Sequence, residues 1–557
     1  MGDKMAKIKQ CAFNANTAEE IRGKKNIDNW PVVYIINSSE EAYVGETVNA
    51  SVRMSQHWQV PSRQRLDQVS IISDEKYNKS VILDLEAYLI SLMSSDDKFR
   101  LQNSNSGMQQ HEYYERLSYE NGFDKIWEAL RKKNLVEHSL YEIQNSELFK
   151  YSPYKALSVD QRNTLYKIIT KLTEASKSGE GMTMIVNGGP GTGKTVLAVY
   201  LMKLLAERNA DIDRSDEDLD DDYLYYGLRN LPKMKIGLVV PMQSLRTTIK
   251  TVFKKVNNLN PKMAISPIQV PKERYDLLIV DEAHRLRQRK ALSQYPSFDK
   301  NNHLLGLDDS GTELDWIRLC SKNQIFFYDE AQSVKPSDID KERFAEMKKE
   351  SNIVEETLTS QFRCKGGNEY IDYIKSIFSD DPPVERKVFP DYEIKLFDDV
   401  NAMVEAIKAR DDEFGLCRTV AGYSWKWTTK NKKGDGLFDI EIDHYRYRWN
   451  SEYLDWVNSE HSIDEIGCIH TIQGYDLNYA GVILGNEIKY DEKSHIIVID
   501  KSQYFDLQGK TALKDDDALQ TYIKNIYSTL MTRGIRGTYV YACDEGMRKY
   551  LSKFINN

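Results

Sequence analysis

A glycine-rich loop between a predicted strand and a predicted helix constrains this chain more than any other feature. The loop spans 188–195, reads Gly-Gly-Pro-Gly-Thr-Gly-Lys-Thr, and directly follows the apolar run 182–186. Glycines let backbone N–H groups turn inward around phosphate oxygens, and the N-terminus of the following helix favours an anion. The pattern therefore predicts that a nucleoside triphosphate binds at this point of the chain.

The same pattern gives the loop residues individual roles. Lys194 is expected to reach the β- and γ-phosphates, and Thr195 is expected to ligate Mg²⁺ and to begin the following helix. The remaining residues predicted to bind the nucleotide are Gly188, Gly189, Pro190, Gly191, Thr192 and Gly193.

Polar side chains at the ends of other predicted strands complete this site. The apolar strand at 276–280 ends in Asp281 and Glu282. A carboxylate beside a phosphate loop can hold Mg²⁺, and its neighbour can align and deprotonate the attacking water, so we assign Asp281 to the metal and Glu282 to the water. A third strand leads to Gln332, which could sense the γ-phosphate, and Gln161 stands where it could read the adenine edge.

Length, charge and cysteine usage narrow the class of protein. A chain of 557 residues predicts about three domains. The net charge of −9 excludes a protein that coats nucleic acid over its whole surface, but it allows a local basic groove. Six scattered cysteines without a Cys-x-x-Cys pair exclude a zinc ribbon and a disulfide framework. Because the sequence has neither a signal core nor an apolar run near the roughly 18 residues of a membrane span, we expect a soluble, cytoplasmic protein without a membrane partner.

The predicted fold class is α/β, in four segments. In the second half, apolar strand-like runs alternate with amphipathic helices, which predicts parallel sheets with crossover helices. These runs lie at 182–186, 236–240, 276–280, 324–328, 466–470, 480–484 and 538–542. The segments are a small α/β domain at 1–110, a connector at 111–157 with helices near 108–119 and 123–135, and lobes at 158–345 and 346–557. The acidic run 211–222 is predicted to be a solvated insertion.

The N-terminal segment gathers a second set of chemically active side chains. Tyr34 lies on a predicted strand at 32–36 and Tyr43 on a second strand that forms a hairpin with it, while Arg53 and His57 share one face of a helix predicted at 49–58. Glu86 lies in the apolar helix 81–93, where a carboxylate is costly unless it is paired, exposed or bound to a cation. These residue types suit metal-assisted phosphodiester cleavage: Glu86 would hold a divalent ion, Arg53 would bind the phosphate, and a tyrosine or His57 would position or deprotonate the water. The alternative is that both tyrosines are hairpin core residues and that His57 is an ordinary surface histidine.

The order of motifs in the second half resembles the Schlafen-type (group 3) DNA/RNA helicase domain of superfamily 1. Beyond the phosphate loop, the resemblance is carried by Thr359-Ser360-Gln361-Phe362-Arg363, by His470-Thr471-Ile472-Gln473-Gly474, and by Met531-Thr532-Arg533-Gly534-Ile535-Arg536. It implies two RecA-like lobes that sandwich ATP, with Arg363 and Arg533 as arginine fingers and with Gly474 and Arg536 at the nucleotide. Arg536 could equally be structural. Strand contacts would come from 241–246, Thr471, Gln473, Trp425 and Trp427.

The N-terminal segment resembles the GIY-YIG nucleases over about 30–110. Tyr43-Val44-Gly45 matches the second motif, the spacing to Arg53, His57 and Glu86 agrees with the family, and Val32-Val33-Tyr34 departs from the first motif but keeps Tyr34. The resemblance implies a small α/β nuclease domain that uses Mg²⁺, with Mn²⁺ as a second candidate ion. Two further residues, Asn103 and Lys79, are candidates for a late polar position and for phosphate binding.

Together the two resemblances imply a nuclease fused to an ATP-driven motor. The expected substrate is a polynucleotide, with DNA favoured over RNA. The architecture resembles bacterial anti-phage machinery, in which a second copy of the chain or another defence protein would be the partner. An RNA-directed enzyme and a nucleotide-switched module that binds nucleic acid without cutting it are the alternatives.

Overall fold

The computed structural model describes most of the chain. The described residues are 6–103, 114, 116–155, 157–209, 227–290, 292, 294–330, 337–361, 364–429, 432, 436–452, 456–472, 475–506, 510 and 516–556. They form two compact units, of which the first comprises Met1–Gly181, Thr195–Leu238 and Thr247–Ala264 and the second comprises Met182–Lys194, Val239–Arg246 and Ile265–Asn557. Among these described residues, none of the helices combines the length and the apolar character that crossing a bilayer requires.

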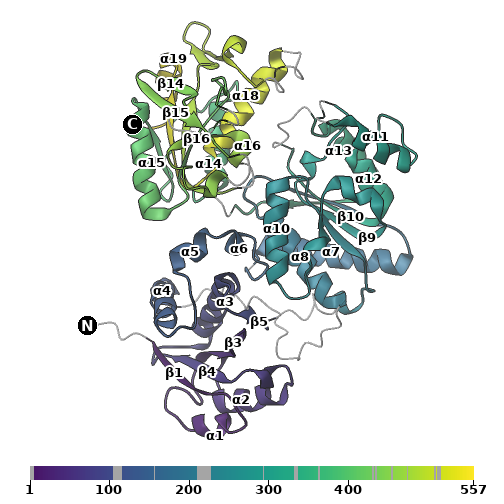
Figure 1. The fold of residues 1–557 in the computed structure, drawn as a ribbon, viewed down its shortest axis with the longest axis vertical. Helices are drawn as coiled ribbons and strands as arrows, with labels where there is room; N and C mark the ends of the chain where they lie inside the picture. The colour runs from purple at the N-terminus through teal and green to yellow at the C-terminus, as the bar shows by residue number, and fades with distance from the viewer. Residues whose placement is uncertain are drawn as a thin grey trace. The chain divides into compact units, whose positions relative to one another are not determined.

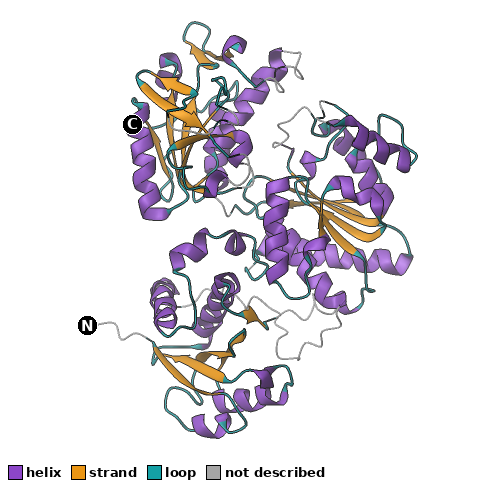
Figure 2. Cartoon of the chain, viewed as in Figure 1, coloured by secondary structure: helices purple, strands orange, loops and turns teal. Residues whose placement is uncertain are grey.

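The N-terminal segment folds around a five-stranded sheet with the order β1-β4-β2-β3-β5 (Figures 1 and 2). The hairpin of β2 and β3 confirms the two predicted strands, and every residue of β2 is buried, as its β-branched sequence favours. The helix predicted at 49–58 is α2, which begins after Asn49, whose side chain accepts a hydrogen bond from the backbone N–H of Val52. The elements are β1 (Lys7–Ala12), α1 (Thr17–Ile21), β2 (Val32–Asn37), β3 (Glu41–Thr47), α2 (Ala50–Gln59), η1 (Arg63–Arg65), β4 (Gln68–Ser73), α3 (Lys79–Asp96) and β5 (Arg100–Leu101).

The connector is helical and packs against α3. Its helices are α4 (Arg116–Lys132), α5 (Leu140–Asn145) and α6 (Glu147–Lys150). The single helix α4 corrects the two helices predicted near 108–119 and 123–135, because it continues through residues 120–122 where a break was expected. Gly122 weakens a helix by about 1 kcal/mol. Burial of Phe123, Trp127 and Leu130 opposes that cost and stabilises the continuous helix.

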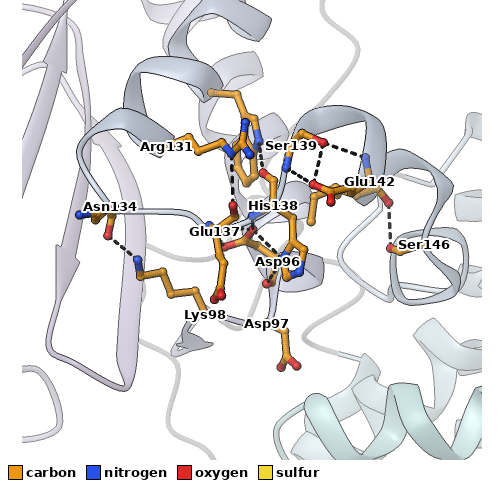
Figure 3. A network of polar contacts seen from close by, with 12 residues as sticks. Asp96, Asp97, Lys98, Arg131, Asn134, Glu137, His138, Ser139, Glu142 and Ser146 are labelled. Atoms are coloured by element: carbon orange, nitrogen blue, oxygen red, sulfur yellow. Dashed lines mark hydrogen bonds and ion pairs between the residues drawn. The ribbon is translucent and has the colours of Figure 1, made fainter. Parts of the chain in front are cut away.

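A buried carboxylate fastens the connector to the end of α3 (Figure 3). Asp96 is 1% exposed, and its carboxylate accepts hydrogen bonds from the backbone N–H groups of Glu137 at 3.0 and 2.8 Å and of His138 at 2.7 Å. The next residue, Ser139, starts α5 through a capping box with Glu142. The turn between α4 and α5 is therefore fixed by the last residue of α3.

The first lobe contains a six-stranded sheet with the order β11-β6-β10-β9-β7-β8. The pairs β10–β6, β10–β9 and β11–β6 are parallel, as the alternating pattern predicts. Strand β11 lies beyond residue 345, so this sheet extends past the boundary expected for the first lobe. The elements are α7 (Val159–Ser178), β6 (Thr183–Gly188), α8 (Lys194–Asn209), β7 (Ile236–Val239), α10 (Gln243–Lys255), η3 (Pro261–Met263), β8 (Ala264–Ile265), η4 (Pro267–Lys272), β9 (Tyr275–Val280), η5 (Ala283–Arg285), α11 (Tyr295–Leu304), α12 (Glu313–Cys320), β10 (Ser321–Tyr328), α13 (Lys341–Met347) and β11 (Ile353–Leu358).

The second lobe contains a seven-stranded sheet with the order β12-β20-β17-β13-β16-β15-β14. Its described pairs are parallel except for the antiparallel edge pair β14–β15. The strand predicted at 466–470 is shorter than expected, because β16 ends at Cys468 and a helical turn follows. The elements are α14 (Gly367–Ile377), β12 (Glu393–Leu396), α15 (Val400–Phe414), β13 (Arg418–Ala421), β14 (Ile440–Ile442), β15 (Tyr445–Trp449), η7 (Trp456–Asn458), β16 (Glu465–Cys468), α16 (Ile469–Ile472), β17 (Leu477–Leu484), β18 (Ile488–Asp491), β19 (Ile496–Ile499), η8 (Lys501–Gln503), α18 (Asp516–Met531), β20 (Gly534–Ala542) and α19 (Glu545–Leu551).

Candidate nucleotide and nuclease sites

The predicted phosphate loop joins β6 to α8. Gly191 and Gly193 have φ angles of +80° and +76°, which glycine adopts without the strain that a side chain would cause. Lys194 is buried, and its ammonium donates to the carbonyl oxygens of Gly188 at 2.6 Å and Gly189 at 2.8 Å. The loop therefore curls around the lysine, and Thr195 follows as the second residue of α8.

The loop lysine also lies beside a carboxylate that the sequence did not single out. The Lys194 Nζ atom is 3.3 Å from the Oδ2 atom of Asp329, which is buried at the end of β10. Gln361, beyond β11, donates a hydrogen bond to the carbonyl oxygen of Pro190. The sequence signal for both was available, since Asp329 ends an apolar strand and Gln361 lies in a matched motif. Neither of these sequence features predicts that its residue contacts the phosphate loop.

The carboxylates assigned to metal and water stand together after β9. Asp281 is fully buried, and its Oδ1 atom accepts a hydrogen bond from the Glu282 backbone N–H at 3.0 Å. Glu282 adopts left-handed angles of φ 50° and ψ 46°, a conformation that costs a non-glycine residue about 1–3 kcal/mol and that clusters at functional sites. The backbone is thus strained where the pattern places the water-activating carboxylate.

Glu282 is held as a carboxylate by its neighbours. Burial alone would raise the pKa of Glu282, but the charges of His284, Lys194 and Arg285 outweigh burial and bring the pKa below its usual value. The closest of these groups is His284, whose Nε2 atom lies 3.0 Å from Glu282 Oε2 and which is itself fully buried. An ionised Glu282 can accept a proton, as the predicted role requires.

Among the predicted nucleotide-site residues, one caps a helix and three lie outside the described residues. Gln161 is buried, and its Oε1 atom accepts a hydrogen bond from the Ser158 backbone N–H at 3.0 Å, so the side chain caps α7. Gln332, Arg363 and Gly474 lie outside the described residues. The role of Gln161 at the adenine and the roles of these three residues remain predictions.

The two C-terminal arginines differ in their surroundings. Arg533 is 3% exposed in the segment between α18 and β20, and its carbonyl oxygen accepts from the Leu477 backbone N–H. Arg536 lies on β20 with its guanidinium carbon 4.5 Å from the ring centroid of Phe414. This stacking favours the structural alternative for Arg536, whereas the finger role of Arg533 stays a prediction.

The proposed strand-contacting aromatics are less exposed than expected. Trp425 and Trp427 are partly buried and pack against the core around Trp449, and the Trp425 Nε1–H donates to the carbonyl oxygen of Glu441 at 3.3 Å. Thr471 is buried, and its hydroxyl bonds to the backbone of Cys468. These contacts give all three side chains a packing role in the second lobe. Gln473 and the acidic run 211–222 lie outside the described residues.

The N-terminal side chains converge as the spacing predicts. The Tyr34 hydroxyl lies 2.7 Å from His57 Nε2, and the Nε–H of Arg53 donates to the same hydroxyl oxygen at 3.2 Å. The ring centroid of Tyr43 is 5.0 Å from that of His57 and 6.4 Å from that of Tyr34. Both tyrosines also belong to the buried hydrophobic core around Met54, so each is part of that core as well as of the candidate site.

His57 is a buried member of this cluster, which corrects the alternative of an ordinary surface histidine. Burial, together with the charges of Arg63 and Arg53, lowers the pKa of His57 to about 2. Both ring nitrogens are engaged, one by Tyr34 and the other by Arg63. Of the two predicted candidates for water activation, a tyrosine therefore fits the geometry better than His57 does.

Glu86 lies on α3, close enough for its charge to act on Tyr34. Its side chain is partly exposed, and its negative charge acts on Tyr34, where it contributes to a pKa raised chiefly by burial of the phenol. The described residues contain no group of three or more His, Cys, Asp or Glu side chains that could hold a metal ion together. A single carboxylate still suits Mg²⁺, which keeps several waters and binds through one or two carboxylates plus substrate phosphates.

Asn103 and Lys79 have structural partners. The Asn103 side chain bonds to both backbone groups of Val44, at 3.0 Å to the N–H and 2.7 Å to the carbonyl oxygen, and so extends the pairing of β5 with β3. Lys79 forms an ion pair with Glu46 on β3. These contacts secure β3, the strand that carries Tyr43.

We expect Gly45→Ala to destabilise the N-terminal sheet by about 1–3 kcal/mol. A methyl group on Gly45 would clash with the hydroxyl and ring of Tyr34, which lies across from it on β2. Hydrogen exchange of β2 and β3 in the full chain measures the effect. The matched control is Gly122→Ala, whose methyl meets nothing within 4 Å and should not lower the protection of β2. Unchanged exchange in the Gly45 variant would contradict the close approach of Tyr34.

We also expect the N-terminal segment to lose stability as the pH falls below about 6.5. The folded state keeps His57 neutral because its pKa is about 2, whereas an unfolded histidine takes up a proton near pH 6.5. The unfolded state then binds more protons, so the opening free energy falls by up to about 1.4 kcal/mol per pH unit. Protection factors of β2 and α2 amides at pH 7 and pH 5.5 measure this slope. The pH dependence of the opening free energy should flatten in His57→Gln and persist in a variant of the exposed His303. An equal slope in both variants would contradict the prediction.

Comparison with known proteins identifies the second half of the chain. Residues 182–544 match the family described as Schlafen group 3, DNA/RNA helicase domain. An uncharacterized protein of Saccharomyces cerevisiae is 30% identical over 398 residues, which cover 66% of this chain and 83% of the yeast protein.

Two solved structures are more distant. One, on DNA unwinding at forked double-stranded DNA by two coordinating Pif1 helicases, has 12% identity and a TM-score of 0.25 over 69% of this chain and 92% of that chain. The other, Caenorhabditis elegans PCH-2, has 15% identity and a TM-score of 0.19 over 67% of this chain and 75% of that chain. TM-scores this low do not establish a shared fold. The family match spans most of the chain and contains the phosphate loop and the Asp281–Glu282 pair, and the chain therefore belongs to the Schlafen group 3 DNA/RNA helicase domain family.

Proposed function

We propose that this protein is an ATP-dependent nucleic-acid motor joined to a divalent-metal-dependent endonuclease that cuts DNA. One observation carries the cutting half: Tyr34, Arg53 and His57 form a single hydrogen-bonded cluster, and Glu86 acts on Tyr34 from α3. The family membership and the phosphate loop support the motor half.

In the motor, Lys194 would leave the loop carbonyls to bind the β- and γ-phosphates of ATP. Thr195 and Asp281 would hold Mg²⁺, which neutralises charge on the phosphates when bound. Glu282, kept ionised by its cationic neighbours, would take the proton of the attacking water. Arg533, and Arg363 from the matched motif, would offset the charge that develops on the γ-phosphate.

In the nuclease, Glu86 would hold one Mg²⁺, and Mn²⁺ meets the same preference for oxygen ligands. The bound ion supplies charge that polarises the scissile phosphate and stabilises the leaving oxygen. Arg53 would bind a phosphate oxygen, and its Nε–H already orients the Tyr34 hydroxyl. Tyr34 is a neutral phenol at pH 7, as the ordinary tyrosine pKa of about 10 already requires, and burial raises that pKa further. Its hydroxyl would donate a hydrogen bond that positions the water.

The proposal also names a substrate and a biological setting. We favour DNA over RNA, and a bacterial anti-phage role follows from the fusion of motor and nuclease alone. The relative in Saccharomyces cerevisiae shows that related chains occur in yeast.

One cleavage experiment tests the proposal. The full chain is incubated with plasmid, single-stranded DNA, duplex DNA and tRNA, each with Mg²⁺ or EDTA and with or without ATP. Metal-dependent cutting of DNA supports the endonuclease, and cutting confined to tRNA makes the enzyme RNA-directed. ATP hydrolysis without any cutting would leave a motor whose N-terminal segment only binds nucleic acid.

A further inference from the structure

Arg63 is the member of the N-terminal cluster to which the function above gives no role. It opens the 3₁₀ turn η1, six residues after His57. Its Nη1 group contacts the Nδ1 atom of His57, and its guanidinium carbon lies 3.9 Å from the ring centroid of Tyr43. Arg63 therefore touches two of the aromatic side chains that form the candidate nuclease site.

The contact between Arg63 and His57 fixes where the histidine carries its proton. An arginine guanidinium only donates hydrogen bonds, so Nδ1 of His57 must accept with its lone pair. A histidine that accepts at Nδ1 is neutral and carries its proton on Nε2. The Nε2–H group therefore donates to the Tyr34 oxygen, 2.7 Å away.

This arrangement also fixes the direction of the Tyr34 proton. A phenol oxygen has two acceptor positions and one proton. The two positions are filled by the Nε–H of Arg53 and by the Nε2–H of His57. The O–H bond of the fully buried Tyr34 must therefore point in a third direction, away from Arg53 and His57.

We propose that Arg63 is a positioning residue that keeps His57 neutral and protonated at Nε2, so that the Tyr34 hydroxyl donates in a direction away from Arg53 and His57. The inference rests on the proposed nuclease function for its catalytic consequence, but the tautomer itself is a property of the folded chain. The charged groups that face this relay are Arg53 and Arg63 beside His57 and Glu86 beside Tyr34. The two cations oppose a charge on His57, in agreement with the lowered pKa of that ring.

Nitrogen NMR of histidine side chains reads the tautomer without any activity. The chain has nine histidines, so His57→Gln assigns the signal by difference. In the wild-type full chain we expect Nδ1 to be unprotonated and Nε2 to be protonated between pH 5.5 and 8. In Arg63→Met we expect a mixture of tautomers and protonation of His57 within that range. A proton on Nδ1 in the wild type, or an unchanged signal in Arg63→Met, would overturn the inference.

Cleavage assays then test the consequence for the reaction. Arg63→Met should slow metal-dependent cutting about 10- to 100-fold, the range typical of groups that orient a functional side chain from behind, and Arg63→Lys should restore part of the loss. The matched control is Arg65→Met, because Arg65 lies in the same turn with a side chain 69% exposed, and this variant should cut as the wild type does. Equal cutting by the wild type and Arg63→Met would overturn the positioning role. If the wild type cuts nothing, the nuclease proposal fails and the NMR result alone decides the role of Arg63.

Discussion

Replacing Lys194 by alanine is expected to lower the rate of ATP hydrolysis by about 100- to 1,000-fold, because the charged donor proposed to bind the reacting phosphates is lost. Steady-state phosphate release by the full chain, with and without single-stranded DNA, measures this effect. The control is Lys171→Ala, which removes a half-exposed lysine paired with Glu174 on α7 and should leave the rate unchanged.

The Lys194 variant needs a second comparison, because the lysine also stabilises the fold. Its ammonium lies 3.3 Å from the buried carboxylate of Asp329, and removing one partner of a buried ion pair is costly. Asp329→Asn combined with Lys194→Ala should recover thermal stability without recovering hydrolysis. If the double variant hydrolyses ATP at the wild-type rate, Lys194 has no role in the chemistry.

Replacing Glu86 by glutamine is expected to slow nucleic-acid cleavage at least about 100-fold while binding is retained, because the amide keeps the shape but no longer attracts a divalent ion. Gel assays of plasmid cutting and filter binding of the same DNA separate the two effects. The matched control is Glu75→Gln, an exposed carboxylate in the same segment, which should cut normally. A Glu86→Gln protein that cuts at the wild-type rate would show that the ion, if needed, binds elsewhere.

The Lys194 variant also reports on the link between the two halves. If ATP hydrolysis drives cutting, Lys194→Ala and Glu86→Gln should both abolish it. If hydrolysis restrains cutting, the Lys194 variant should cut without ATP control. Equal cutting by the wild type and the Lys194 variant, with and without ATP, would separate the two activities.

Short-range sequence patterns predicted those elements of the two candidate sites whose residues are close together in the sequence. The strand before Gly188, the hairpin that carries Tyr34, and the shared helix face of Arg53 and His57 all follow from short-range periodicity, and the structure confirms these elements. The cluster of Tyr34 with His57 then follows from packing α2 on the sheet.

The contacts that the sequence could not predict join residues through tertiary structure. Arg63 meets His57 only because the chain turns back after α2 through a 3₁₀ turn, for which the sequence carries no strong signal. Asp329 meets Lys194 because β10 and β6 are adjacent parallel strands, and strand order is not encoded locally. Gln161, which is predicted to read an adenine edge, caps α7 as well, because a glutamine three residues after a serine can satisfy a helix end.

The Asp96 carboxylate has a consequence for how this module can be inherited. Its oxygens accept hydrogen bonds from two backbone N–H groups, those of Glu137 and His138, so a recombination event that ended the N-terminal module at residue 110 would leave a buried carboxyl group without these donors. A transferable cassette must therefore carry the chain at least through His138. Natural fusions that join this N-terminal segment to other domains should have their junctions beyond that point.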